Sequence, residues 1–210
     1  MGGNADLPVV DPADLPEDAG DVDVHGVVLA AGESRRYGDR NKLLTELEGE
    51  PLVVHATRPL VESAVTGVTV VVGFQASRVR DALSDLSVSI RENPAYVDGQ
   101  STSVAIGVRA ARERGADAVL IALGDMPRIT GGTIDTLVAA YAGGVGDAIA
   151  AAYDGIRGNP VVFDSRYFDP LLDVDGDVGG REILLGDSDA VAVETGDPGV
   201  VHDVDSPADL

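Results

Sequence analysis

Hydrophobic residues along this chain occur either in short continuous runs or in longer amphipathic stretches. The continuous runs are rich in β-branched residues and alanine, which predicts buried strands. They lie at Val24–Ala30, Gly67–Val72, Val88–Ile90, Val119–Leu123 and Ala148–Ala152. The amphipathic stretches between them predict helices at Pro51–Ser63, Gln75–Leu86, Ser101–Arg114 and Thr130–Tyr141. This alternation predicts an α/β fold, with a mostly parallel, Rossmann-like sheet and helices on both faces.

The two ends of the chain depart from this alternation. Residues 1–23 are rich in Asp, Pro and Gly and carry no apolar period, so we expect a disordered N-terminal tail before a single domain at 24–210. After Tyr153 the pattern becomes irregular. Short strands are expected at Val161–Phe163 and Val191–Val193, with a helix near Gly180–Leu185.

Composition narrows the function classes. The 210 residues include 36 acidic and 15 basic side chains, which gives a net charge of -21. This acidic excess indicates a protein adapted to high salt, because salt screens the repulsion between carboxylates. No basic face for nucleic acid is visible. Without cysteine, neither a disulfide nor a thiolate metal site can form. No apolar run approaches the roughly 20 residues that span a bilayer, and no signal-like segment opens the chain, so we expect a cytoplasmic location without membrane contact.

Lys42 is the single lysine of the chain, and it closes a glycine-rich loop after the first predicted strand. Arg35, Arg36 and Arg40 make the loop locally basic, which favours an anion such as a nucleoside triphosphate. Backbone N–H groups around Ala31–Ser34 can cradle phosphates. A role for Lys42 as an ordinary surface residue is the alternative.

Three familiar motifs do not fit. Five residues separate Gly32 from Gly38 and Leu43 follows the lysine, so the loop is not a Walker-type phosphate loop. No G-x-G-x-x-G is present and no acidic residue ends the second strand, which disfavours a dehydrogenase. The acidic run at 173–177 lacks the glycine and the glutamate of a calcium loop, since Val178 and Leu184 stand there.

Asp125 follows the strand at Val119–Leu123, so it should lie at the same sheet edge as the Gly32 loop. A carboxylate there can hold Mg²⁺ together with phosphate oxygens. Asp125 could instead cap the following turn. Asp203 or Asp205 could complete a metal site, or could belong to a solvated acidic segment.

The order of these motifs resembles the MobA-like nucleotidyltransferases, and within them the molybdenum-cofactor cytidylyltransferases. The opening signature is Leu29-Ala30-Ala31-Gly32-x-Ser34-x-Arg36-x-Gly38, with Lys42 four residues later. Further matches are Asn93-Pro94, Gly99–Ser103, Gly124–Pro127, Gly158–Val161, the Gly176–Arg181 segment and the ending at 202–210. Tyr37 replaces the usual methionine, and one extra residue precedes the lysine. Asn159 stands where this subfamily usually has histidine, which puts the acceptor in doubt.

The resemblance implies a fold of the nucleotide-diphospho-sugar transferase type. It implies transfer of CMP from CTP to molybdopterin with release of pyrophosphate, using Mg²⁺. Lys42, Arg36 and Asp125 would be catalytic, and Asp125 and Asp205 would bind the metal. The nucleotide would lie against Leu29, Ala30, Ala31, Gly32, Ser34, Asn93, Ser101 and Ser103. Ser101–Ser103 could equally serve only to cap their helix.

Other functions remain open at this point. Within the same class, the chain could transfer GMP to molybdopterin, or a nucleotide to a sugar or polyol phosphate. In different classes, it could be an oxidoreductase, or a non-catalytic accessory protein that delivers the cofactor to a molybdenum hydroxylase.

Overall fold

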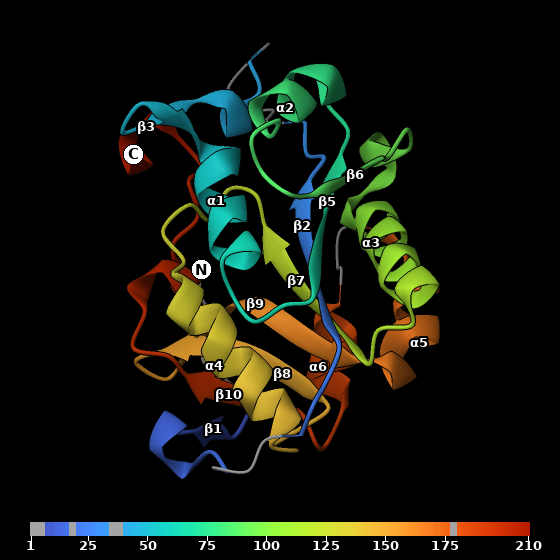
Figure 1. Cartoon of the computed structure of the whole chain (residues 1–210), viewed down its shortest axis with the longest axis vertical. Coiled ribbons are helices and arrows are strands. Elements are labelled where there is room, and N and C mark those ends of the chain that lie inside the picture. Colours follow the sequence, from blue (N-terminus) through green and yellow to red (C-terminus); the bar gives the residue numbers. More distant parts are fainter. Residues whose placement is uncertain (1–6, 17–19, 34–39, 177–179) are drawn as a thin grey trace.

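Eight strands form one mostly parallel sheet in the computed structural model, which describes residues 7–16, 20–33, 40–176 and 180–210 (Figure 1). Their spatial order is β1 (Val9–Val10), β10 (Val191–Glu194), β8 (Ala148–Tyr153), β9 (Ile156–Asp164), β7 (Ala118–Leu123), β2 (Val24–Ala30), β5 (Gly67–Val72) and β6 (Ser89–Glu92). β9 runs antiparallel to β7 and β8, and the other neighbours pair in parallel. A hairpin of β3 (Glu46–Leu47) and β4 (Glu50–Pro51) stands apart.

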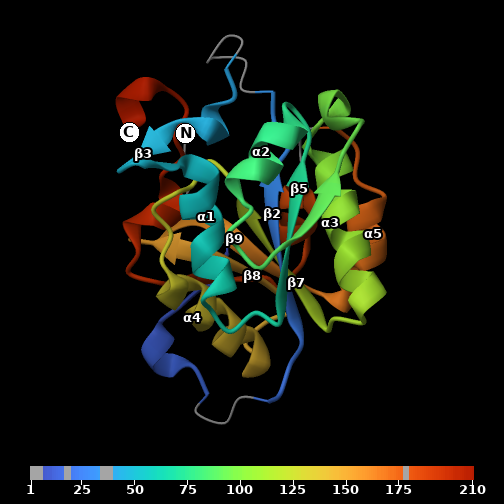
Figure 2. The same ribbon diagram turned by 45° about the horizontal axis from the view of Figure 1, so that its top comes forward.

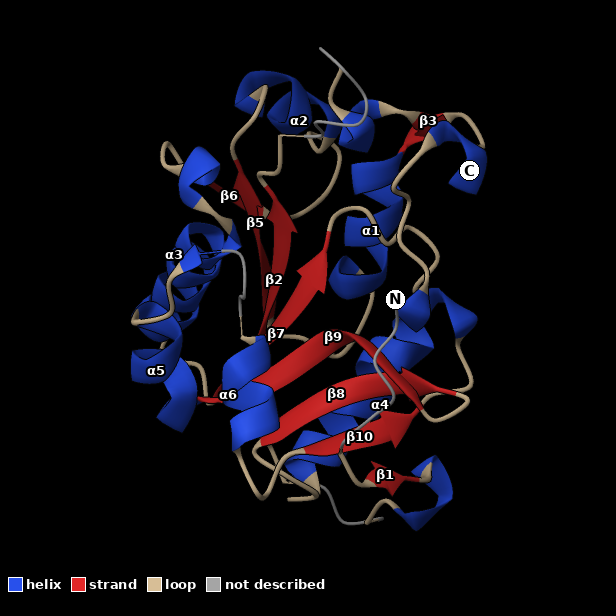
Figure 3. Ribbon diagram, turned by 180° about the vertical axis from the view of Figure 1, so that it is seen from behind, coloured by secondary structure: helices blue, strands red, loops and turns tan. Residues whose placement is uncertain are grey.

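Helices cover both faces of the sheet, as the sequence predicts (Figures 1 and 3). One face carries α1 (Leu52–Val61), α2 (Ala76–Ala82) and α4 (Gly131–Ala142). The other carries α3 (Gln100–Arg114), α5 (Phe168–Leu172) and α6 (Arg181–Gly186). Short 3₁₀ helices lie at Pro12–Asp14, Lys42–Leu44, Tyr96–Asp98, Ser165–Tyr167, Pro198–Val201 and Pro207–Asp209.

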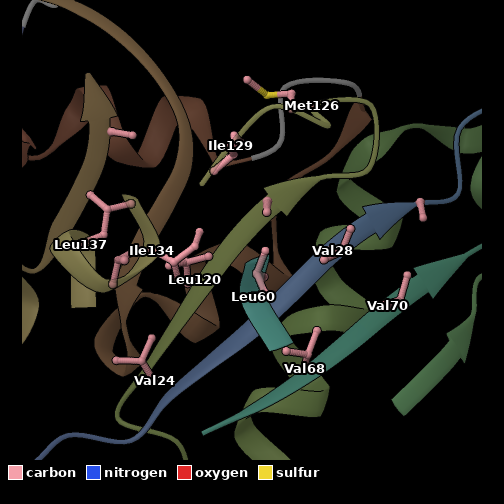
Figure 4. Packing of buried hydrophobic residues seen from close by; sticks show 14 of the residues in the cluster. Val24, Val28, Leu60, Val68, Val70, Leu120, Met126, Ile129, Ile134 and Leu137 are labelled. Atoms are coloured by element: carbon pink, nitrogen blue, oxygen red, sulfur yellow. The ribbon is translucent and has the colours of Figure 1, made fainter. Parts of the chain in front are cut away.

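Alternate residues of the central strands form two hydrophobic cores. Val24, Val28 and Leu120 point to the α1–α4 side, where they pack with Leu60 and Leu137 (Figure 4). Their neighbours Val27, Leu29 and Val119 join the core beneath α3 and α5. Because both faces of the sheet are buried, the central strands consist of continuous apolar runs. These runs made the strands easy to predict from the sequence. β2 and β5 have the predicted bounds to the residue.

β9 is longer than the predicted strand Val161–Phe163, and it runs antiparallel to both of its neighbours. Its nine residues include Gly158 and Pro160, which weaken any strand pattern. The glycine is required by packing, because a Cβ atom there would lie 1.9 Å from the Val200 carbonyl oxygen. α5 was not predicted, since five residues containing Pro170 show no helical period.

Part of the predicted N-terminal tail belongs to the sheet. Val9 and Val10 of β1 pair with Ala192 and Val193 of β10. Leu7 is buried in the core beneath α3, with 8% of its surface exposed. The expectation of a disordered segment therefore does not hold for residues 7–16, because a two-residue strand is too short to show a period.

No helix among the described residues combines the length and apolar character needed to cross a membrane. Figure 2, in which the top of the molecule comes forward, shows the C-terminal segment beside β3. This brings the last described residues to the end of the sheet at which β2 and β7 finish.

Candidate active site

The carboxyl ends of β2 and β7 are held close together by backbone contacts. The Gly124 N–H donates to the Leu29 carbonyl at 2.9 Å, and the Phe74 N–H donates to the Ala31 carbonyl at 3.2 Å. A Cβ atom on Gly73 would lie 2.8 Å from the Ala31 oxygen. The loops that follow three central strands are therefore packed closely enough to share one site.

Lys42 begins a 3₁₀ turn, Lys42–Leu44, whose position is fixed by the preceding residue. The Asn41 side-chain oxygen accepts the Leu43 N–H at 3.0 Å, and its amide nitrogen donates to the Phe74 carbonyl at 2.8 Å. Asn41 is buried, with 3% exposure, and Leu43 packs into the core. This turn directs the lysine toward the strand ends.

The Lys42 ammonium lies among oxygen atoms from two distant segments. Its Nζ atom donates to Asp125 Oδ2 at 2.6 Å, to the Val204 carbonyl at 3.1 Å and to Asp205 Oδ1 at 3.5 Å. Burial alone would lower the pKa of Lys42, but the Asp125 carboxylate, assisted by Asp205, raises this pKa above its ordinary value. Lys42 is therefore protonated and positively charged at neutral pH.

Asp125, Asp203 and Asp205 form a cluster in which one oxygen of each lies within 4.8 Å of the others. The Val204 N–H donates to the Asp125 carbonyl at 2.8 Å, which ties the C-terminal segment to the loop after β7. These hard oxygen donors suit Mg²⁺ or Mn²⁺, and a cationic group of the protein itself already lies against two of them. The donor set therefore fits a divalent cation.

A cavity of about 390 Å³ opens beside this cluster. Six of the predicted site residues line it: Leu29, Ala31, Gly32, Lys42, Ser103 and Asp125. Among the described residues, Ala30, Asn93 and Ser101 are buried and do not contribute to its lining. Asp205 does not line the cavity itself, but it contacts Lys42, which does. Ser34 and Arg36, also predicted here, lie outside the described residues.

Asn93 holds the start of α3 in place. Its amide nitrogen donates to Thr102 Oγ1 at 2.8 Å and to Ser103 Oγ at 2.9 Å, while its oxygen accepts the Ala95 N–H at 2.9 Å. The side chain is only 1% exposed. Asn93 is thereby placed to position Ser103, which does line the cavity.

Sequence reasoning missed several lining residues, namely Glu33, Leu43, Tyr96, Val97, Gly99, Gln100 and Leu123. Gly99 has a φ of 117°, which lets the chain turn from the short 3₁₀ helix at Tyr96–Asp98 into α3. The run Gly99–Ser103 is a sequence signal for this turn. The neighbouring Tyr96 and Val97 belong to no motif, so the sequence did not identify them as lining residues.

A second cavity, of about 270 Å³, adjoins the first and shares Leu29, Gln100 and Leu123 with it. Its polar lining consists of the shared Gln100 together with Arg157, Asn159 and Arg181. The remainder is apolar and consists of Val104, Ile121, Val161, Phe163, Gly180 and Leu184. Such a pocket suits an anionic group attached to a flat or apolar body.

Comparison with known proteins relates the chain to one family and to several of its relatives. Residues 26–191 match the family model described as the MobA-like NTP transferase domain. The chain is 31% identical to the purine catabolism protein PucB of Bacillus subtilis over 196 residues, which cover 87% of this chain and 91% of PucB. It is 34% identical to the bifunctional protein GlmU of Agrobacterium fabrum over 122 residues, but spans only 26% of that protein.

Solved structures agree on the fold. A nucleotidyl transferase from Methanothermobacter thermautotroptrophicus superposes with a TM-score of 0.76 at 25% identity, covering 90% of this chain and 94% of that one. The Mycobacterium tuberculosis protein Rv0371c in complex with manganese superposes with a TM-score of 0.70 at 24% identity, covering 89% and 95%.

Proposed function

This chain belongs to the MobA-like NTP transferase family, and on that premise we propose that it transfers CMP from CTP to molybdopterin and releases pyrophosphate. The class of reaction, nucleotidyl transfer, follows from the family. The nucleotide, the acceptor and the metal are the parts that we propose here, with the residues that carry them.

The observation that carries the proposal is the position of Lys42. Its ammonium contacts Asp125 at 2.6 Å and lines the cavity formed where β2 and β7 end. A mobile lysine can neutralise a triphosphate, and the backbone of Ala31 and Gly32 can approach its phosphates. We assign these residues to the nucleotide, together with Leu29 and Ser103.

Asp125 and Asp205, with Asp203 beside them, are the proposed metal ligands. A bound Mg²⁺ would neutralise phosphate charge and orient the departing pyrophosphate. The residues of the chain then have two tasks, which are to hold the triphosphate in one orientation and to keep the acceptor in line with the α-phosphorus.

The second cavity is the proposed acceptor site. Arg157 and Arg181 can hold a phosphate, and Phe163 and Leu184 offer an apolar surface to a ring system. An oxygen of the acceptor phosphate would attack the α-phosphorus while the bond from that phosphorus to the bridging oxygen breaks. This phosphate is already ionised near neutral pH, so the attack needs no general base.

Pyrophosphate release tests the proposal. The purified protein is incubated in high salt and Mg²⁺ with CTP, GTP, ATP or UTP, each with and without molybdopterin. We expect release only with CTP and molybdopterin together. Selective release with GTP would overturn the choice of nucleotide, and a lack of release with every nucleotide and acceptor would overturn the transfer itself.

A sugar or polyol phosphate is the competing acceptor within the same class. A fold neighbour from Anaerococcus prevotii is a 4-diphosphocytidyl-2C-methyl-D-erythritol synthase, at 13% identity and a TM-score of 0.69. Replacing molybdopterin by polyol and sugar phosphates in the same assay separates these acceptors. Release that depends on such a phosphate and not on molybdopterin would favour this alternative.

The likeness to PucB over 91% of that protein favours a second candidate, an accessory role in purine catabolism. In that case the chain would bind the cofactor and deliver it to a molybdenum hydroxylase without transferring a nucleotide. If Asp125→Asn abolishes transfer but the variant still binds molybdopterin, delivery is excluded as the sole function. If the wild-type protein releases no pyrophosphate but activates the hydroxylase, delivery is the function. An oxidoreductase would instead require a bound flavin or nicotinamide, which absorbance measurements on the same samples detect.

A further inference from the structure

Lys42 occupies the place where a cation is expected to bind. Its Nζ atom contacts Asp125 Oδ2 at 2.6 Å and Asp205 Oδ1 at 3.5 Å, and both carboxylates belong to the proposed metal cluster. The lysine side chain is only 16% exposed, and its ammonium also donates to the Val204 carbonyl at 3.1 Å. A lysine dedicated to the triphosphate alone would not need this arrangement.

We propose that Lys42 acts as an internal cation that a divalent metal displaces. In the nucleotide-free protein, the ammonium offsets part of the negative charge of the Asp125–Asp205 pair. When a metal binds to these carboxylates, Lys42 moves to the triphosphate in the same cavity. One lysine thus keeps the carboxylates together before the metal binds, and afterwards neutralises the substrate.

Two physical features support this exchange. A divalent cation bound through Asp125 and Asp205 would lie close to the ammonium that already contacts both, and the two positive charges would repel each other. The four-carbon lysine stem can turn about its own bonds, so Nζ can move while the backbone of the Lys42–Leu44 turn stays in place.

Metal affinity measured without nucleotide tests the first half of the proposal. Mn²⁺ is titrated into the full chain, and the free ion is followed by electron paramagnetic resonance. We expect Lys42→Met to bind Mn²⁺ about tenfold more tightly than the wild-type protein, because the competing charge is gone. Equal or weaker binding by Lys42→Met would overturn the proposal.

Arg91→Met is the matched control, since it also removes one positive charge and one ion pair. Arg91 contacts Glu113 at 2.6 Å, both side chains are more than half exposed, and neither lines a described cavity. We expect its Mn²⁺ affinity to change less than twofold. If Arg91→Met tightens binding as much as Lys42→Met does, the effect comes from net charge and the exchange is overturned.

The wild-type protein offers a second measurement that needs no folded variant. Because Lys42 is the single lysine, labelling the lysine side-chain nitrogen with ¹⁵N gives one Nζ signal in an NMR spectrum. We expect this signal to shift as Mg²⁺ is added, and to shift again when a non-cleavable CTP analogue follows. A signal that stays unchanged at saturating Mg²⁺ would overturn the exchange.

The displacement of Lys42 rests on the proposed metal site, and its destination rests in addition on the proposed nucleotide. A first shift with Mg²⁺ supports the displacement whatever the enzyme assays give. If the shift with nucleotide is missing while pyrophosphate is released normally, the triphosphate is not the destination of Lys42, although transfer itself stands. Loss of both the release and the second shift would count against the proposed function alone.

Discussion

Single residues decide the chemistry of this site, and the sequence located some of them better than others. Lys42 and Asp125 could be predicted because each follows a buried strand, and such strand ends meet at one edge of a parallel sheet. Asp205 was ambiguous, since only the folded chain brings it within 3.5 Å of Lys42 Nζ. Asn93 was identified by its motif, but only the structure shows that its side chain holds Thr102 and Ser103 at the start of α3.

The first prediction at this scale concerns Asp125→Asn. The amide keeps the shape but loses the charge that pairs with Lys42 and would hold the metal, so we expect nucleotidyl transfer to fall about a hundredfold or more. The control is Asp169→Asn, which removes an exposed carboxylate paired with Arg112. Steady-state pyrophosphate release and thermal unfolding are measured for both. Near-normal activity in Asp125→Asn would contradict the assigned role.

The second prediction concerns His25, which is buried and contacts Thr69 Oγ1 at 2.9 Å. Burial, with Arg114 nearby and Asp23 opposing in part, lowers the pKa of His25 from 6.5 to about 4. Between these values the unfolded chain binds the extra proton, so the free energy of unfolding should fall by up to about 3 kcal/mol as pH drops from 6.5 toward 4. This contribution is fully present above pH 6.5.

Urea denaturation at several pH values measures this loss. His25→Gln removes the titrating group, so its stability should depend less on pH across the window than that of the wild-type protein. Parallel curves for the two proteins would exclude His25 as the source.

At the scale of elements, the sequence predicted most of the buried strands, but it missed β1 and found only Val161–Phe163 of β9. β2 and β5 are buried on both faces, and their apolar runs were unmistakable. β1 has two residues, and β9 contains Gly158 and Pro160, so neither shows a period. β1 pairs with β10, far away in the sequence, and β9 pairs with the distant β7 as well as with its hairpin neighbour β8.

The third prediction tests whether β1 and its flanking residue contribute to stability. Leu7 is 8% exposed within a hydrophobic core, whereas Val9, two residues away, is 45% exposed. We expect Leu7→Ala to lower the free energy of unfolding by about 2 kcal/mol and Val9→Ala to change it by less than about 0.5 kcal/mol. Chemical denaturation measures both. Equal effects of the two changes would mean that this segment packs too weakly to be part of the fold.

At the scale of the whole molecule, a net charge of -21 dominates the surface. Neighbouring carboxylates repel one another in the folded state, and the range of this repulsion shrinks from about 10 Å at 0.1 M salt to about 3 Å at 1 M. The charge excess was visible in the sequence. Its clustering into the Asp125–Asp203–Asp205 group required the fold.

The fourth prediction follows from this screening. Raising KCl from about 0.1 M to about 2 M should increase the melting temperature by several degrees. This corresponds to a gain in the free energy of unfolding on the order of 1–3 kcal/mol. Sucrose at equal osmolality is the control, because it stabilises by exclusion from the surface without screening charge. Differential scanning calorimetry compares the two series. A larger gain in sucrose than in KCl would argue against repulsion as the limiting factor.

The long sequence separation within the site also has a consequence in time. Asp125 follows Lys42 by 83 residues, and Asp205 follows it by 163. At 5–20 residues per second, a ribosome needs about ten to thirty seconds to proceed from the lysine to its second partner. Throughout that interval the emerging chain carries Lys42 without both of its carboxylate partners. A nascent chain therefore acquires this pair only after most of the sheet has been synthesised.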